Sequence, residues 1–154
     1  MRIFLVTFLI GTFFSQVTFS NDLKNKYIKF YNPTIKFVKS NHKVTSGYLT
    51  IENISEGNLI LKSVSSNISK KTEIHDMKIE QDIMKMEKIK NPIIIPKGKK
   101  IVFEPGGLHI MFIKLKNNLM LKENKIVIFE FEKYGKIEIF MKVKKLVMKK
   151  EHKH

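Results

Sequence analysis

The chain has 154 residues and no cysteine, which predicts one domain and excludes both a disulfide framework and a thiolate metal site. The formal net charge is +15, yet the only arginine is Arg2, so lysine carries nearly all of the positive charge. Arginine is the usual reader of bases and phosphates, so its scarcity argues against nucleic-acid binding and leaves a weak attraction to an anionic membrane surface open.

The first twenty residues have the three-part layout of a secretory signal peptide. Arg2 precedes a mostly apolar run over residues 3–14, and small residues precede a cleavage site after Ser20. The run is shorter than the ~20 residues that a transmembrane helix needs, and the sequence offers no cysteine for a lipid anchor. We therefore expect residues 1–20 to be a signal peptide, the protein to be periplasmic, and residues 21–143 to form the folded domain.

The mature sequence predicts an all-β domain. Short β-branched and aromatic runs with apolar alternation, such as Leu49 and Ile51 on one face, predict strands and no helix. The predicted strands span residues 27–31, 35–38, 47–53, 59–64, 72–77, 83–89, 100–103, 108–115, 125–131 and 136–143. A turn is predicted at Asn32-Pro33, and all four prolines are expected at strand boundaries. A β-sandwich or Greek-key barrel follows, with a flexible Lys/His-rich tail over residues 144–154.

Three of the predicted strands carry histidine or methionine at positions i and i+2, which place both side chains on one face of a strand. The pairs are His75 with Met77, Met84 with Met86, and His109 with Met111. Neighbouring strands would gather these side chains into one cluster of imidazole and thioether. The alternative interpretation is ordinary core packing, in which methionine is a common filler.

A cluster of this composition would select its metal. Thioether sulfur is soft and favours Cu(I), and imidazole also suits copper. Zinc more often recruits cysteine or carboxylate, and a blue-copper electron-transfer centre requires a cysteine that this chain lacks. The donor types therefore indicate a site that holds and passes on copper rather than one that carries electrons.

The spacing and its surroundings resemble the periplasmic copper chaperones of the PCu(A)C family. Their pattern is a His, ten residues, a Met, about twenty-one residues, then His-x-Met; here the long gap holds twenty-two, with the extra residue near Asn91-Pro92. The segments TEIHDM, IMKMEKI and IPKGKKIVFEPGGLHIMFIKL carry most of the similarity, which covers residues 35–143. The resemblance implies a cupredoxin-like Greek-key β-sandwich and four Cu(I) ligands, namely His75, Met86, His109 and Met111. Met77 is then an auxiliary donor candidate, and Met84 a core or rim residue.

The resemblance also implies a function, which is that of an exported, non-enzymatic chaperone that supplies Cu(I) for cytochrome c oxidase assembly. The partner would be the copper-bearing oxidase subunit or a thioredoxin-like copper assembly protein, and the chaperone would be a monomer. No phosphate loop, nucleophile elbow or meaningful carboxylate pair is present, so no catalytic residue is predicted.

Two alternatives stay open. One is a periplasmic copper-sequestering protein with the same site, and the other is an exported β-sandwich binding module in which His and Met only pack. In the tail, His152 and His154 could capture Cu(II), although a solvated lysine-rich end is the favoured interpretation of that segment.

Overall fold

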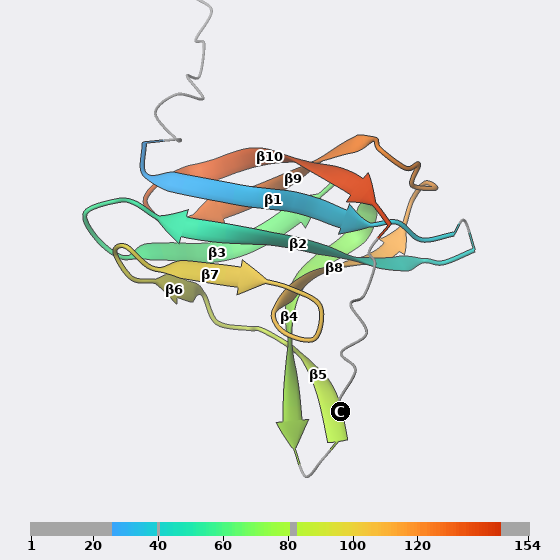
Figure 1. Cartoon of the computed structure of the whole chain (residues 1–154), viewed down its shortest axis with the longest axis horizontal. Helices are drawn as coiled ribbons and strands as arrows, with labels where there is room; N and C mark the ends of the chain where they lie inside the picture. Colours follow the sequence, from blue (N-terminus) through green and yellow to red (C-terminus); the bar gives the residue numbers. More distant parts are fainter. Residues whose placement is uncertain (1–25, 40, 81–82, 146–154) are drawn as a thin grey trace, which may run out of the picture.

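A computed structural model describes residues 26–39, 41–80 and 83–145 (Figure 1). The predicted signal peptide and residues 146–154 of the tail lie outside the described residues. The strands are β1 (Ile28–Lys36), β2 (Val44–Asn53), β3 (Leu59–Ser66), β4 (Ser69–Glu80), β5 (Ile83–Lys88), β6 (Ile93–Ile95), β7 (Lys100–Phe103), β8 (His109–Leu115), β9 (Asn124–Phe131) and β10 (Gly135–Lys144). Within these ranges, no helix is long and apolar enough to cross a membrane.

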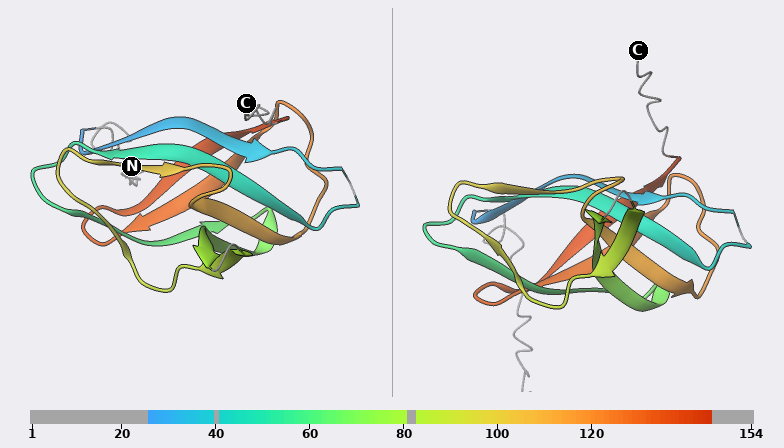
Figure 2. Two further views of the ribbon diagram at one scale, coloured as in Figure 1. Left: turned by 60° about the horizontal axis from the view of Figure 1, so that its bottom comes forward. Right: turned by 90° about the horizontal axis from the view of Figure 1, so that it is seen from below.

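The strands follow one hydrogen-bonded path that folds over into two layers (Figures 1 and 2). Its order is β5-β4-β8-β2-β1-β10-β9-β3-β6, and β7 pairs with the remaining length of β2. The pairing of β1 with β10 is parallel, and the other pairings are antiparallel. The predicted all-β sandwich is confirmed.

The core lies between the two layers and is built from the inward face of each strand. Leu49 and Ile51 of β2 pack in one cluster with Phe129 and Phe131 of β9, and all four side chains are almost fully buried. Phe30 of β1 joins them, with its ring centroid 5.5 Å from that of Phe129. Burying a large apolar side chain contributes about 1.5–3 kcal/mol, so packing of this kind replaces the disulfides that the chain lacks.

Two sequence predictions about strand boundaries are wrong. Asn32-Pro33 is not a turn, because β1 continues through it as a bulge, with a register shift against β2 between Tyr31 and Thr34. Asn32 has φ 50°, which bends the strand without ending it. Pro33 therefore lies inside a strand. The sequence prediction also omitted β6, whose three residues lie between two prolines.

The segment with the most direct bearing on the predicted donors is the connection from β7 to β8. These two strands lie end to end along one edge of β2, since Phe103 pairs with Leu49 and Ile110 with Gly47. Residues 104–108 leave the sheet between these points, and the loop is closed by a 2.7 Å hydrogen bond from Glu104 N to Leu108 O. The chain thus re-enters the sheet at His109.

The position of β8 depends on a close approach between a buried aromatic ring and the backbone of β2. A Cβ atom at Gly47 would lie 2.9 Å from Phe112 Cε2 and 3.3 Å from Met141 Cε. Both neighbouring side chains are fully buried, so neither can move away freely.

We predict that Gly47→Ala lowers the free energy of unfolding by about 1–3 kcal/mol, the range typical of overpacking. Gly57→Ala is the matched control, because a Cβ there meets no atom within 4 Å. Urea unfolding of the two variants measures the difference. An equal cost for both would show that the Phe112 contact is not the constraint.

Candidate metal centre

All four predicted ligands lie on one face of the three neighbouring strands β5, β4 and β8. Directly paired residues of antiparallel strands project to the same side of the sheet. Three such pairs lie on this face, and each is called a row below. One joins β4 to β5, namely Met77 with Met86, and two join β4 to β8, namely His75 with His109 and Glu73 with Met111. The register therefore brings the predicted donors together and adds Met77 and Glu73 to them.

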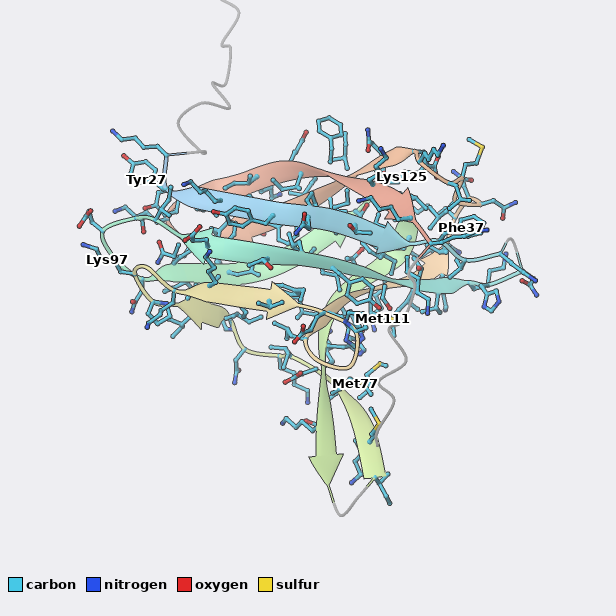
Figure 3. The ribbon with its side chains drawn as sticks, in the orientation of Figure 1. Tyr27, Phe37, Met77, Lys97, Met111 and Lys125 are labelled. Carbon is cyan, nitrogen blue, oxygen red and sulfur yellow. The ribbon has the colours of Figure 1, made fainter. Side chains whose placement is uncertain are left out.

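The two histidines form the middle row. Their ring centroids lie 6.0 Å apart with an interplanar angle of 44°. Met86 and Met111 are each diagonal neighbours of His75, one on either side strand. Diagonal positions are about 7–8 Å apart at Cα, which is within reach of long side chains. In Figure 3, Met111 lies at the edge of the sandwich and Met77 lies in the β4–β5 hairpin that projects from it.

Exposure differs strongly among the donors. His109 is 4% exposed, Met77 and Met111 are half-buried, and Met86 is 48% exposed on a strand whose side chains all face solvent. Met84 is 61% exposed, so it belongs to the rim and not to the core. The face thus combines a buried imidazole, His109, and a partly buried one, His75, with thioethers that solvent can reach.

Each imidazole has one nitrogen engaged and one available. His109 Nδ1 lies 2.8 Å from Gly107 O, and a carbonyl only accepts, so this nitrogen donates its proton and Nε2 keeps a lone pair. His75 Nε2 lies 2.9 Å from Glu73 Oε2, so here Nε2 donates to the carboxylate. His75 Nδ1 is buried and has no hydrogen-bond partner among the described residues. A buried polar atom without a partner costs about 1–3 kcal/mol. A metal ion bound to His75 Nδ1 would supply the partner that this nitrogen lacks.

Glu73 is a residue of this face that the sequence analysis missed. Its side chain is almost fully buried, and its Oε1 lies 2.7 Å from Lys88 Nζ and 2.9 Å from Lys71 Nζ. These contacts are ion pairs rather than well-directed hydrogen bonds. The Lys88 ammonium, together with His75 and Lys71, lowers the pKa of Glu73 from 4.5 to about 2 against the opposing effect of burial. The signal was present in the sequence, because Glu73 stands two residues before His75 and shares its face.

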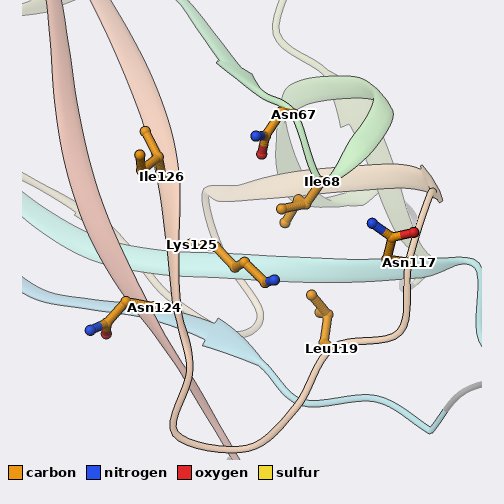
Figure 4. A pocket seen from close by; sticks show the side chains of 7 residues that line it. All are labelled: Asn67, Ile68, Asn117, Leu119, Asn124, Lys125 and Ile126. Carbon is orange, nitrogen blue, oxygen red and sulfur yellow. The ribbon is translucent and has the colours of Figure 1, made fainter.

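Met111 also lines an open groove of about 580 Å³. Phe37 and Val44 contribute apolar walls, and His42, which had no assigned partner in the sequence, lies along the same groove. A separate pocket of about 250 Å³ lies beyond the start of β4 (Figure 4) and has none of the predicted donors in its lining. Its lining residues are Asn67, Ile68, Asn117, Leu119, Asn124, Lys125 and Ile126. The groove, unlike this pocket, includes one of the predicted donors, Met111, in its lining.

The donor chemistry of the face is therefore imidazole and thioether. Across the described ranges, no group of three or more His, Asp or Glu side chains is placed to hold a metal ion. The tail histidines His152 and His154 lie outside those ranges. The orphaned Nδ1 of His75, the available Nε2 of His109 and the neighbouring thioethers fit a soft, monovalent ion.

Comparison with known proteins shows that the chain matches one family model and several solved structures. A family model described as "Putative lipoprotein LpqE-like" matches residues 28–143. The solved apo PCuAC domain from PmoF1 is 21% identical with a TM-score of 0.65, covering 78% of this chain and 95% of that one. The copper-bound PCuAC domain from PmoF2 is 18% identical with a TM-score of 0.64, and the match covers 78% of this chain and 94% of that one. Cu(I)-bound DR1885 from Deinococcus radiodurans is 19% identical with a TM-score of 0.61, and the match covers 79% of this chain and 80% of that one.

These similarities confirm the PCu(A)C resemblance and the predicted cupredoxin-like β-sandwich. At such identities they establish the fold, and the ligand set stays a prediction. No curated protein sequence matches the chain.

We predict that the stability contributed by Glu73 depends on pH in a defined direction. Because the folded-state pKa lies below the ordinary value, this stability is fully present above pH 4.5 and is lost as the pH falls toward about 2. Glu73→Gln should therefore cost at most about 3 kcal/mol near neutral pH and clearly less at about pH 3. Urea unfolding at both pH values measures this change, and a cost independent of pH would contradict it. Glu56→Gln, on an exposed ion pair with Lys97, is the control.

Proposed function

The chain belongs to the LpqE-like family, and from that premise we propose that it is an exported, non-enzymatic copper chaperone that carries Cu(I). The observation that carries the proposal is the shared face of β5, β4 and β8. There, the register brings two imidazoles and at least two thioethers to one face, and His75 Nδ1 is buried without a hydrogen-bond partner in the described part of the chain. The solved structures of the copper-bound PmoF2 domain and of Cu(I)-bound DR1885, which have the same fold, support it.

The chemistry of the face favours Cu(I) over harder ions. Methionine sulfur is soft and neutral, whereas Zn²⁺ would more often recruit thiolate or carboxylate. The one carboxylate in these three rows belongs to Glu73, and it is already engaged by His75, Lys71 and Lys88. We therefore assign His75, Met86, His109 and Met111 as ligands, with Met77 as an auxiliary donor opposite Met86.

Release of the ion follows from the difference in exposure. Met86 is half exposed and Met111 borders the groove, while His109 is buried. An incoming donor from a recipient protein would displace a thioether first and the imidazoles last. Such stepwise ligand exchange lets a tightly held ion move without passing through water.

Export and destination complete the proposal. The signal-like residues 1–20 and the lipoprotein description of the family support export, although this sequence contains no cysteine to lipidate. Delivery to the copper centre of cytochrome c oxidase, directly or through a thioredoxin-like assembly protein, rests on the PCu(A)C resemblance. A sequestering protein would have the same site, and it differs in holding copper when a recipient is offered.

We predict that an anaerobic titration with a competing Cu(I) chelator finds one Cu(I) per chain, and that two substitutions weaken binding by at least about tenfold, because each removes a ligand. These are His109→Ala and Met111→Ile, the latter keeping volume and apolarity so that the fold should persist. Met120→Ile is the matched control, since Met120 is 67% exposed and lies outside the three rows. Wild-type affinity in Met111→Ile would remove that residue from the ligand set. Absence of Cu(I) binding by the wild type would favour a module without metal.

We also predict that Cu(I) affinity falls as the pH is lowered from about 7.5 to about 5. Imidazole must be deprotonated to bind a metal, whereas thioether does not titrate. The same chelator competition measures the affinity at each pH. A flat profile over this range would argue against histidine ligation.

A further inference from the structure

We propose that Glu73 is the positioning residue of this centre, with two effects through two contacts. Its Oε2 fixes His75 in the tautomer that presents Nδ1, and its Oε1 anchors β5, the strand that carries Met86. The first effect concerns the protein without metal and is independent of the proposed function. The consequence for Cu(I) rests on that function.

The tautomer follows from the acceptor. An ionised carboxylate has no proton to give, so the 2.9 Å contact with His75 Nε2 requires the imidazole to be the donor. A neutral imidazole has one N–H, and Nδ1 is then left with its lone pair. His109 has the opposite arrangement, because Gly107 O holds its Nδ1–H. The paired rings therefore present different nitrogens, and a side chain sets the choice in His75 while the backbone sets it in His109.

The anchoring role of Glu73 at β5 follows from the exposure of that strand. Every residue of β5 is exposed, so side-chain burial adds little to the backbone ladder that pairs this strand with β4. Lys88 lies directly opposite His75 in the register, and its ammonium reaches the buried Glu73 carboxylate at 2.7 Å. A second ion pair from β5, between Glu87 and Lys78, joins two exposed groups, and exposed pairs of this kind contribute little.

The burial of Glu73 makes these contacts necessary. A buried carboxylate is costly unless it is paired and hydrogen-bonded. Here the imidazole and two lysines meet that requirement together, so moving any one of them changes the environment of the other two. The orientation of His75 and one side-chain contact that holds the Met86 strand thereby depend on the same carboxylate.

The tautomer is tested in the apo protein by long-range ¹H–¹⁵N NMR of the imidazole rings at about pH 8, where neutral imidazole dominates. We expect His75 to carry its proton on Nε2 in the wild type. In Glu73→Gln, whose amide can donate as well as accept, a substantial share of Nδ1–H should appear. His109 should not change, which serves as the internal control for the fold. An Nδ1–H form of His75 in the wild type, or no change in Glu73→Gln, would overturn the proposal.

The consequence for copper is tested by chelator competition on the same variants. Glu73→Gln should lower Cu(I) affinity by about 10–100-fold, the range for lost partners of metal-binding histidines. If the wild type binds Cu(I) and Glu73→Gln binds it equally, the positioning role fails. If the wild type binds none, the proposed function fails and the tautomer result still stands.

The anchoring of β5 has a matched pair of variants. Lys88→Met and Lys71→Met each remove one ammonium from Glu73 Oε1, but only Lys88 lies on the strand of Met86. We expect Lys88→Met to lower Cu(I) affinity at least about threefold more than Lys71→Met, with His75 keeping the Nε2–H tautomer in both. Equal effects of the two substitutions would contradict the anchoring role.

Discussion

The register of β4 between β8 and β5 is the constraint on which the candidate centre depends. A slip of one residue would send every second side chain to the opposite face of the sheet. The register is secured from the other side, where Ile74 of β4 pairs with Ile110 of β8 and both are buried in the core. The donor face is therefore the reverse side of a packed hydrophobic pair, and apolar burial on one side positions soft donors on the other.

The β7–β8 edge of β2 completes this arrangement. Phe112 packs on the backbone of β2 at Gly47, and the loop of residues 104–108 returns the chain to the sheet at His109. That loop also supplies Gly107 O, the partner of the His109 ring. Rigid packing thus reaches the buried histidine, whereas Met86 stands on a strand outside the core. The candidate centre therefore combines a histidine held by the packed core with a methionine that is more accessible to solvent.

Much of this was predictable from the sequence because period-two alternation reports burial directly. Leu49 and Ile51 identified an inward face, and the i, i+2 spacing of His109 and Met111 identified a shared side. The bulge at Asn32-Pro33 was not predictable, since an Asn-Pro pair indicates a turn unless the partner strand is known. The residue pattern alone did not separate Met84 from Met86, and only the family resemblance singled out Met86. The register pairs Met86 with Met77 and Met84 with Ile79. Glu73 was on the right face, but its contact with Lys88 comes from the neighbouring strand and could not be read from the sequence.

In the described part of the chain, β5 ends the path of strands, so one edge of its backbone has no neighbouring strand. Open edges of this kind promote aggregation, and lysines beside them are a common defence. Lys85 and Lys88 stand on this strand, next to three exposed apolar side chains. Exposed apolar side chains at an open strand edge favour association between chains, and the neighbouring positive charges oppose it. The abundance of lysine therefore has a local use at this strand edge.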